Sequence, residues 1–395
     1  MEDRPLIIVG SGPAGAATGL RLAQRHPELA RDTLILDKAI HPRDKVCAGG
    51  LIPHTLACLR DLGVELSVPH VVVDRATVRT PTREVRYEGN DICRVVRRRD
   101  FDASLVAAVR ARGVGVNEGE KVVDVARDGD GIRVETERTS YRARAVVGAD
   151  GSGSLVRRRL LDQTSAHTGR AVMCDVPIAA VSWTGFHRHA YDFNFEAVAR
   201  GLRGYSWAFP CWINGEPHVN VGAYAVDTPG ALLTRLTEQE LARVGSTVRP
   251  RFHAFPIHWY DHRAPLACPR AMLVGDAAGV DPLMGEGISF ALEYGRRAAD
   301  ALHAAFASGD FSFAAYQQDV RGSWLGSKLR RLNLAVRLFY GPTWRVWFAI
   351  AERSGRAREL GLRWYNGIDD WDQRSGWDAV RALWSGEFAP PPAPV

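Results

Sequence analysis

The stretch Leu6-Ile-Ile-Val9-Gly10-Ser-Gly12-Pro-Ala-Gly15 decides the fold of this chain. Its apolar start predicts a short buried strand of a parallel sheet, because such strands are covered on both faces. Residues 16–25 predict a helix with small side chains toward that strand, and residues 33–36 predict a second strand. This strand–helix–strand order predicts a Rossmann-like α/β fold.

The three glycines of this turn indicate nucleotide binding. Gly10 allows a tight turn, Gly12 lets the backbone approach a pyrophosphate, and Gly15 lets the helix pack closely on the strand. The first turn of the helix, which holds Pro13 and Ala14, presents unpaired N–H groups to phosphate oxygens. All five residues are therefore predicted cofactor contacts.

An acidic residue follows at the end of the second strand. Asp37 lies roughly 20 residues after Gly15, where a carboxylate accepts hydrogen bonds from ribose hydroxyls. We therefore predict that Asp37 and its neighbour Lys38 contact the nucleotide. The chain has no second Gly-x-Gly-x-x-Gly spacing, so it predicts no separate NAD(P)H domain.

Two later segments indicate that the nucleotide is FAD rather than NAD. Residues 146–157 resemble the A-D-G-x-x-S-x-x-R motif of flavin-dependent aromatic hydroxylases, with Asp150 as its aspartate. Residues 273–279 resemble the second G-D motif of that superfamily, in which the residue matching Asp276 holds the ribityl chain and Gly275 precedes it. The arginine that contacts the cofactor in these proteins matches one of three consecutive arginines, and we assign it to Arg98. The resemblance implies non-covalent FAD.

Within that superfamily the chain resembles the geranylgeranyl reductase-like family of FAD-dependent oxidoreductases. Three segments carry the resemblance: residues 45–50 are similar to K-x-C-x-G-G, residues 205–210 to Y-x-W-x-F-P, and residues 282–288 to P-x-x-G-E-G-I. It covers residues 5–310 well and the last part of the chain weakly. The further cofactor contacts that it implies are Cys47, Ala48, Gly49, Gly285, Gly287 and Ile288.

The same segments supply the candidate catalytic residues. Cys47 follows Lys45 in a glycine turn, where it is either a proton donor or a small buried apolar side chain. Lys45 either contacts phosphate or is simply solvated. Tyr205, Trp207 and Phe209 alternate along a strand and therefore share one face, which lines either an apolar substrate cavity or ordinary core.

The resemblance implies a reductase, in which reduced FAD delivers hydride to a carbon–carbon double bond of a prenyl or secondary-metabolite substrate. The alternative is a monooxygenase acting on an aromatic small molecule or on a side chain of a partner protein. A halogenase is disfavoured, because such enzymes use a W-x-W-x-I-P strand and a lysine, and this chain has few lysines. Electrons would come from transiently bound NAD(P)H, or from an external reductase or ferredoxin.

We expect three parts in the chain. An FAD-binding domain of glutathione-reductase type takes residues 1–170 and 262–310. An inserted antiparallel β-sheet domain for substrate takes residues 171–261, with a contribution from residues 65–100. A helical segment takes residues 311–395, and its amphipathic stretch 328–340 either docks on the core or lies on a membrane surface.

Composition excludes several other classes of protein. The chain of 395 residues is 46% hydrophobic, with 51 basic and 45 acidic residues, which is ordinary for a globular protein. The modest positive charge is almost entirely arginine and gives no reason to expect a nucleic-acid partner. The six cysteines form no C-x-x-C pair, and the acidic N-terminus resembles no signal peptide, so we expect a cytoplasmic protein. No apolar stretch reaches the roughly 18 residues of a membrane span.

A group of five histidines raises the question of a metal. They are His187, His189, His253, His258 and His262. None belongs to a helical His-x-x-x-His pair with an acidic third ligand, so the sequence predicts no metal site.

Overall fold

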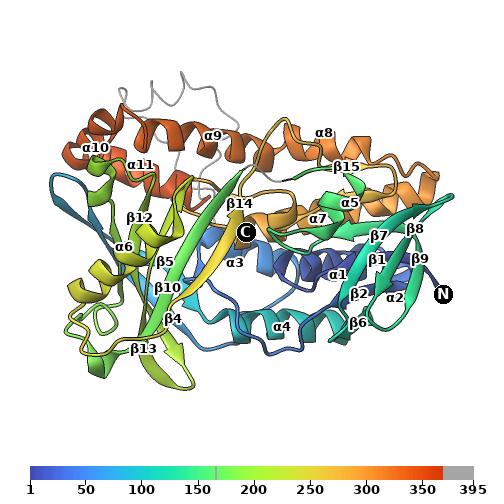
Figure 1. Cartoon of the computed structure of the whole chain (residues 1–395), viewed down its shortest axis with the longest axis horizontal. Coiled ribbons are helices and arrows are strands. Elements are labelled where there is room, and N and C mark those ends of the chain that lie inside the picture. The colour runs from blue at the N-terminus through green and yellow to red at the C-terminus, as the bar shows by residue number, and fades with distance from the viewer. Residues whose placement is uncertain (165–166, 368–395) are drawn as a thin grey trace.

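The computed structural model of the chain describes residues 1–164 and 167–367, and two β-sheets organise it (Figure 1). The first sheet lies on the right of Figure 1 and the second on the left, and helices α8 to α11 run along the top. The predicted α/β class is confirmed, with mixed sheets and a helical C-terminal region in the described residues.

The first sheet has the order β15-β16-β9-β1-β2-β6, and β16, β9, β1, β2 and β6 pair in parallel. Its strands are β1 (Glu2–Val9), β2 (Thr33–Asp37), β6 (Gly115–Glu118), β9 (Ser140–Gly148), β15 (Ala267–Cys268) and β16 (Ala271–Leu273). The hairpin β7 (Val122–Asp128) and β8 (Gly131–Thr136) joins it through β9. The carboxyl ends of β1, β2, β9 and β16 therefore meet at one edge, where ligands bind in open α/β sheets.

Helices cover this sheet and carry its loops. They are α1 (Pro13–Arg25), α2 (Pro27–Arg31), α3 (Pro53–Asp61), α4 (Arg98–Ala111), α5 (Leu155–Leu160) and α7 (Ile288–Ser308). Helix α7 packs directly on α1. The two helices are so close at Gly295 that a Cβ there would lie 2.6 Å from the carbonyl oxygen of Ala14. Helix α4 begins at Arg98, whose side chain pairs with Asp102 one turn later.

The second sheet has the order β14-β10-β13-β12-β11-β4-β5-β3. Its strands are β3 (Gly50–Leu51), β4 (His70–Arg79), β5 (Glu84–Val96), β10 (Thr168–Pro177), β11 (Ala190–Asn194), β12 (Gly204–Ile213), β13 (Glu216–Val226) and β14 (His253–His258), and α6 (Gly230–Arg243) packs on it. The prediction of a purely antiparallel sheet is wrong in one place, because β11 pairs in parallel with β4. Strands β4 and β5 come from much earlier in the chain, so the local sequence around β11 could not reveal this pairing.

The C-terminal region consists of α8 (Ala314–Gly322), α9 (Trp324–Phe339), α10 (Trp344–Arg353) and α11 (Gly355–Tyr365). Within the amphipathic stretch 328–340, Leu329, Leu332 and Val336 are buried in the main core, and Phe339 packs against it. The amphipathic helix therefore docks on the protein by the face that carries these side chains. No helix in residues 1–164 and 167–367 is long and apolar enough to cross a membrane. The predicted helical segment beyond residue 367 lies outside the described residues.

Candidate active site

A cavity of about 570 Å³ lies where the carboxyl edge of the first sheet faces the second sheet. It brings together most residues that the sequence singled out: Gly10, Gly12, Pro13, Ala14, Asp37, Lys38, Lys45, Cys47, Ala48, Gly49, Arg98, Asp150, Tyr205, Trp207, Phe209, Asp276, Gly285, Gly287 and Ile288. Two predicted contacts, Gly15 and Gly275, do not line it.

The glycine turn between β1 and α1 forms one end of the cavity. Gly10 has φ of +105°, and a Cβ there would lie 2.3 Å from the carbonyl oxygen of Ala149. A Cβ at Gly15 would lie 1.9 Å from the carbonyl oxygen of Gly10, so Gly15 closes the turn from behind. At Gly12 the nearest atom to a Cβ is Arg43 Nη2, at 4.0 Å, so the backbone is open toward the cavity. This is the shape that a pyrophosphate requires at a helix N-terminus.

Gly275 acts on the same end of the cavity through packing. It has φ of +58°, and a Cβ there would lie 2.8 Å from the Cβ of Ala14. The turn after β16 therefore sits tightly against the start of α1 and leaves Asp276, the next residue, on the cavity wall.

Three carboxylates surround the predicted cofactor site. Asp37 accepts hydrogen bonds from the backbone N–H and the hydroxyl of Ser11, at 2.8 and 2.6 Å. Asp276 accepts from the hydroxyl of Ser152 at 3.0 Å. Asp150 accepts from two backbone N–H groups at the start of α5, and its Oδ1 is buried without a partner among the described residues. Each carboxylate keeps acceptor capacity for the hydroxyls of a ligand.

Two arginines share one buried carboxylate beside the glycine turn. Arg98 donates to both oxygens of Asp102, at 2.7 and 2.9 Å, and Arg43 Nη2 lies 3.0 Å from Asp102 Oδ2. Burial acts to lower the pKa of Arg98, but the Asp102 charge outweighs it and raises the pKa. Among the described residues Arg43 Nη1 has no hydrogen-bond partner although it is buried. Arg43 lines the cavity, and the sequence analysis did not single it out.

The loop 43–49 carries the two candidate catalytic side chains. Lys45 Nζ lies 2.8 Å from the ring centre of Phe255, a residue of β14 that also lines the cavity. Burial lowers the pKa of Lys45 to about 8, although the charge of Asp276 acts in the opposite direction. Cys47 Sγ accepts from the backbone N–H of Gly49 at 3.3 Å, in a turn where Gly49 has φ of +82°.

Aromatic side chains form the opposite wall. Tyr205, Trp207 and Phe209 of β12 are all buried and face the cavity, and Phe193 of β11 contacts the rings of Tyr205 and Phe209 at 5.5 and 5.2 Å. The Tyr205 hydroxyl donates to the carbonyl oxygen of Met284 at 2.7 Å. Trp207 Nε1 donates to Asn220 Oδ1 at 2.7 Å. The polar atoms are thus satisfied by the protein, which leaves ring faces for an apolar ligand.

The loop between β16 and α7 adds acidic groups that the sequence analysis did not assign. Asp281 accepts from the backbone N–H groups of Leu283 and Met284, at 2.6 and 3.1 Å, and from the Tyr365 hydroxyl at 3.3 Å. Burial raises the pKa of Asp281 to about 7. Glu286 and Tyr365 line the cavity, so α11 closes part of it. Only the fold brings Tyr365 to this loop.

The five histidines considered above do not form a metal cluster in the described residues. His258 Nδ1 lies 3.0 Å from the carbonyl oxygen of Asp276, and burial lowers the pKa of His258 to about 4. In residues 1–164 and 167–367, one other group of side chains could hold a metal ion: His54, Cys58 and Glu293. Their ligand atoms all lie within 4.8 Å of one another. Glu293 lies on a different helix, more than 200 residues after Cys58, so no local sequence pattern marks this group.

Comparisons with known proteins match the chain to FAD-binding proteins. Residues 3–310 match the sequence family described as "FAD binding domain". A menaquinone reductase of Mycolicibacterium smegmatis is 30% identical over 320 residues, which cover 75% of each chain. The chloroplastic geranylgeranyl diphosphate reductase of Oryza sativa is 28% identical over 411 residues, covering 94% of this chain and 80% of the relative.

Solved structures show the same fold. A geranylgeranyl bacteriochlorophyll reductase-like protein of Thermoplasma acidophilum superposes with a TM-score of 0.69, at 21% identity over 91% of this chain and 99% of that protein. A flavin-dependent brominase superposes with a TM-score of 0.72, at 18% identity over 98% and 100%. At such identities the likeness describes the fold alone.

Proposed function

The chain belongs to the geranylgeranyl reductase-like family of FAD-dependent oxidoreductases, and from this premise we propose that it reduces carbon–carbon double bonds of an apolar, prenyl-type substrate. One observation carries the proposal: a single cavity joins the glycine turn suited to FAD with a wall of buried aromatic rings. The relatives named menaquinone reductase and geranylgeranyl diphosphate reductase support it.

We assign the cofactor side of the cavity to the first sheet, as a glutathione-reductase-type domain of residues 1–170 and 262–310. The open backbone at Gly12 and the unpartnered Nη1 of Arg43 suit the pyrophosphate. Asp37 and Asp276 suit the hydroxyls of ribose and ribityl. When bound, FAD supplies the hydride that the reaction requires.

We assign the substrate side to the second sheet, which comprises residues 171–261 with a contribution from residues 65–100. The rings of Phe193, Tyr205 and Phe209 present apolar faces and exclude water. A prenyl chain gains free energy by burying its surface there, at roughly 25 cal/mol per Å². Such a wall contributes little to binding a strongly polar substrate.

Reduction of a double bond also consumes a proton, and two side chains in the loop 43–49 are placed to hold one. We propose Cys47 as the proton donor, because its thiol lies on the cavity wall in a turn held by Gly49. Lys45, with a pKa lowered to about 8, is the second source and carries positive charge near the cofactor site at neutral pH.

The electron donor is proposed to be NAD(P)H bound transiently, or an external reductase or ferredoxin. We also propose that the protein is cytoplasmic and touches membrane only at its surface. Leu334, Val346 and Ile350 are exposed on α9 and α10, beside the exposed Arg337 and Arg345, a combination that suits an anionic lipid surface.

The reductase proposal is tested with the FAD-loaded protein, reduced by dithionite under anaerobic conditions. Menaquinone and a geranylgeranylated lipid are supplied in separate reactions, and the masses of the products are measured by mass spectrometry. After any quinol has been reoxidised in air, we expect one of them to carry two additional hydrogen atoms for each carbon–carbon double bond reduced. If both substrates return unchanged under all conditions, the substrate class is wrong.

A second function, monooxygenase or halogenase chemistry, is favoured by one observation. Lysines are scarce in this chain, yet one of them, Lys45, lies on the cavity wall over Phe255. The strand 205–210 still differs from the W-x-W-x-I-P pattern. A product that gains oxygen or halogen, and forms only when air is admitted, would assign the chain to this second class.

A further inference from the structure

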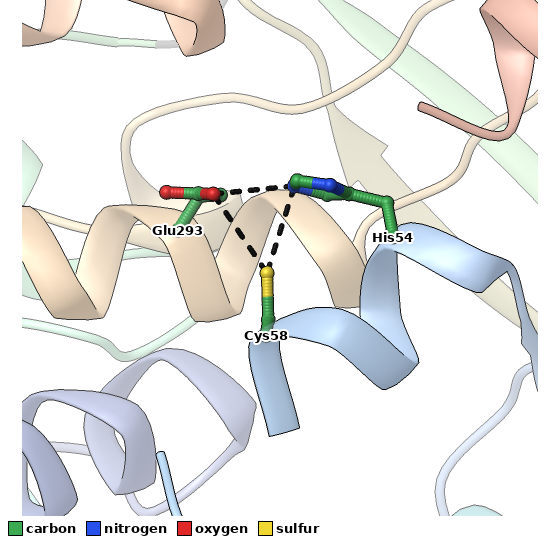
Figure 2. Close-up of side chains that lie close together, drawn as sticks. All are labelled: His54, Cys58 and Glu293. Atoms are coloured by element: carbon green, nitrogen blue, oxygen red, sulfur yellow. Dashed lines mark hydrogen bonds and ion pairs between the residues drawn. The ribbon is translucent and has the colours of Figure 1, made fainter. Parts of the chain in front are cut away.

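Three potential metal ligands converge outside the cavity, between α3 and α7 (Figure 2). His54 and Cys58 lie one turn apart on α3, so their side chains leave the helix on the same face. Glu293 projects from the facing side of α7, and Figure 2 shows all three side chains pointing toward one another. Cys58 is 2% exposed and Glu293 is 7% exposed, so solvent does not separate them.

The distances between the donor atoms match one face of a tetrahedral zinc site. Cys58 Sγ lies 3.5 Å from His54 Nε2, His54 Nε2 lies 3.2 Å from Glu293 Oε1, and Cys58 Sγ lies 3.7 Å from Glu293 Oε1. Zinc bonds of about 2.3 Å to sulfur and about 2.0–2.1 Å to nitrogen or oxygen, at tetrahedral angles, place these atoms about 3.3–3.6 Å apart. The observed triangle therefore leaves room for an ion within bonding distance of each atom.

Direct hydrogen bonding explains the triangle less well. A charge-assisted bond between histidine and carboxylate is about 2.7–2.9 Å long, shorter than the 3.2 Å between His54 and Glu293. Glu293 Oε1 also faces Arg296 Nη1 at 3.0 Å, so three donors would crowd one oxygen. An ion between the three side chains relieves this crowding, because Glu293 Oε1 then contacts only the ion and the Arg296 guanidinium.

The surroundings provide the support that metal ligands usually have. Arg296 fixes Glu293 and reaches Asp61 Oδ2 at 2.8 Å at the end of α3. The ring of Trp324 lies 4.3 Å from the imidazole of His54 and fixes its plane.

Positive charge near the cluster is the main physical objection to a cation. Arg296 and Arg297 lie within 4 Å of Glu293. Each is also paired with a second carboxylate, Arg296 with Asp61 at 2.8 Å and Arg297 with Asp319 at 2.7 Å. The arginine charges are thus balanced without Glu293, which leaves its charge and that of a Cys58 thiolate to neutralise a divalent ion.

We propose that His54, Cys58 and Glu293 bind a divalent ion of the zinc class, with the fourth position open to water. On binding, Cys58 releases its thiol proton to solvent and forms the metal–sulfur bond. The ion ties α3, which follows the loop 43–49, to α7, which follows the loop 281–287. The role of the ion is therefore to hold the loops 43–49 and 281–287 in a fixed position relative to each other. The metal site does not depend on the proposed substrate.

The test uses the FAD-loaded protein stripped of metal and then dialysed against zinc. We expect about one zinc per chain by elemental analysis in the native protein and near none in Cys58→Ser. Cys268→Ser, which changes a half-buried cysteine far from the cluster in sequence, is the matched control and should keep the metal. Because the thiol must lose a proton, zinc affinity should rise with pH.

Cobalt provides an independent readout that needs no activity. Cobalt held tetrahedrally by a thiolate gives ligand-field absorption to the red of the oxidised flavin, and this band should disappear in Cys58→Ser but persist in Cys268→Ser. The proposal is overturned if the stripped native protein takes up no zinc at micromolar concentration. It is also overturned if Cys58→Ser, folded by circular dichroism, binds zinc or cobalt as the native protein does.

Discussion

The two walls of the cavity are built on different principles. On the cofactor side, the first sheet presents backbone atoms at a glycine turn, and the missing side chains make the site. On the substrate side, the second sheet presents large aromatic side chains on a strand whose backbone is entirely regular. The first wall therefore tolerates no added atom at Gly10 or Gly15, whereas the second wall is set by the volume and shape of its rings.

The largest effect is expected on the cofactor wall. In Gly10→Ala the new Cβ would lie 2.3 Å from the carbonyl oxygen of Ala149, at a φ of +105° that side chains avoid. The turn must therefore shift, and FAD affinity should fall by more than about 100-fold, equivalent to about 2.8 kcal/mol. Flavin fluorescence titration measures this. Gly322→Ala, where a Cβ meets nothing within 4 Å, is the control and should bind FAD normally.

The second largest effect is expected for Cys47, which lies in the loop 43–49 on the cavity wall. Cys47→Ala removes a half-buried thiol from a cavity-lining turn, so FAD binding and fold should be retained. Turnover should fall by about 10²–10⁴-fold if the thiol donates the proton. Single-turnover rates with the reduced protein measure this, and Cys268→Ala serves as the control. Full activity in Cys47→Ala would show that the proton comes from Lys45, water or another group.

A third change probes the aromatic wall. Trp207→Ala should destabilise the protein by roughly 3–5 kcal/mol, because it truncates a buried aromatic side chain. Denaturant unfolding measures the stability, and a separate titration follows FAD affinity, which should change little. Substrate affinity should fall as well. A marked loss of FAD instead would mean that the two walls do not act separately.

The smallest effect concerns pH. Because burial lowers the pKa of Lys45 from 10.5 to about 8, the unfolded chain binds more protons than the folded protein between these values. The free energy of unfolding should therefore rise with pH in this window, by at most about 1.4 kcal/mol per unit. Activity that needs the ammonium should fall as pH passes 8. In Lys45→Met both dependences should disappear, as followed by denaturant unfolding and pH–rate profiles.

The local sequence was sufficient to predict most of the residues on the proposed cofactor side of the cavity. The turn 10–15, Asp37 and the segment 273–279 were all recognisable because each glycine or carboxylate meets its requirement within a few residues of a strand end. The membership of the family was likewise predicted from short motifs. It is confirmed by the FAD-binding-domain match over residues 3–310 together with the relatives named menaquinone reductase and geranylgeranyl diphosphate reductase. These features are readable because backbone conformation is encoded locally.

Tertiary structure decided the rest. Arg43, Phe255 and Tyr365 reach the cavity from three separate regions, and β11 finds a parallel partner in β4, more than 100 residues earlier. Likewise, His54 and Cys58 meet Glu293 only because α3 packs against α7. Their side chains carry no local mark of these encounters, since which helix faces meet depends on the packing of the whole core. The sequence by itself determined the glycine turn and the family. The packed fold determined which aromatic rings line the cavity and that His54, Cys58 and Glu293 lie together.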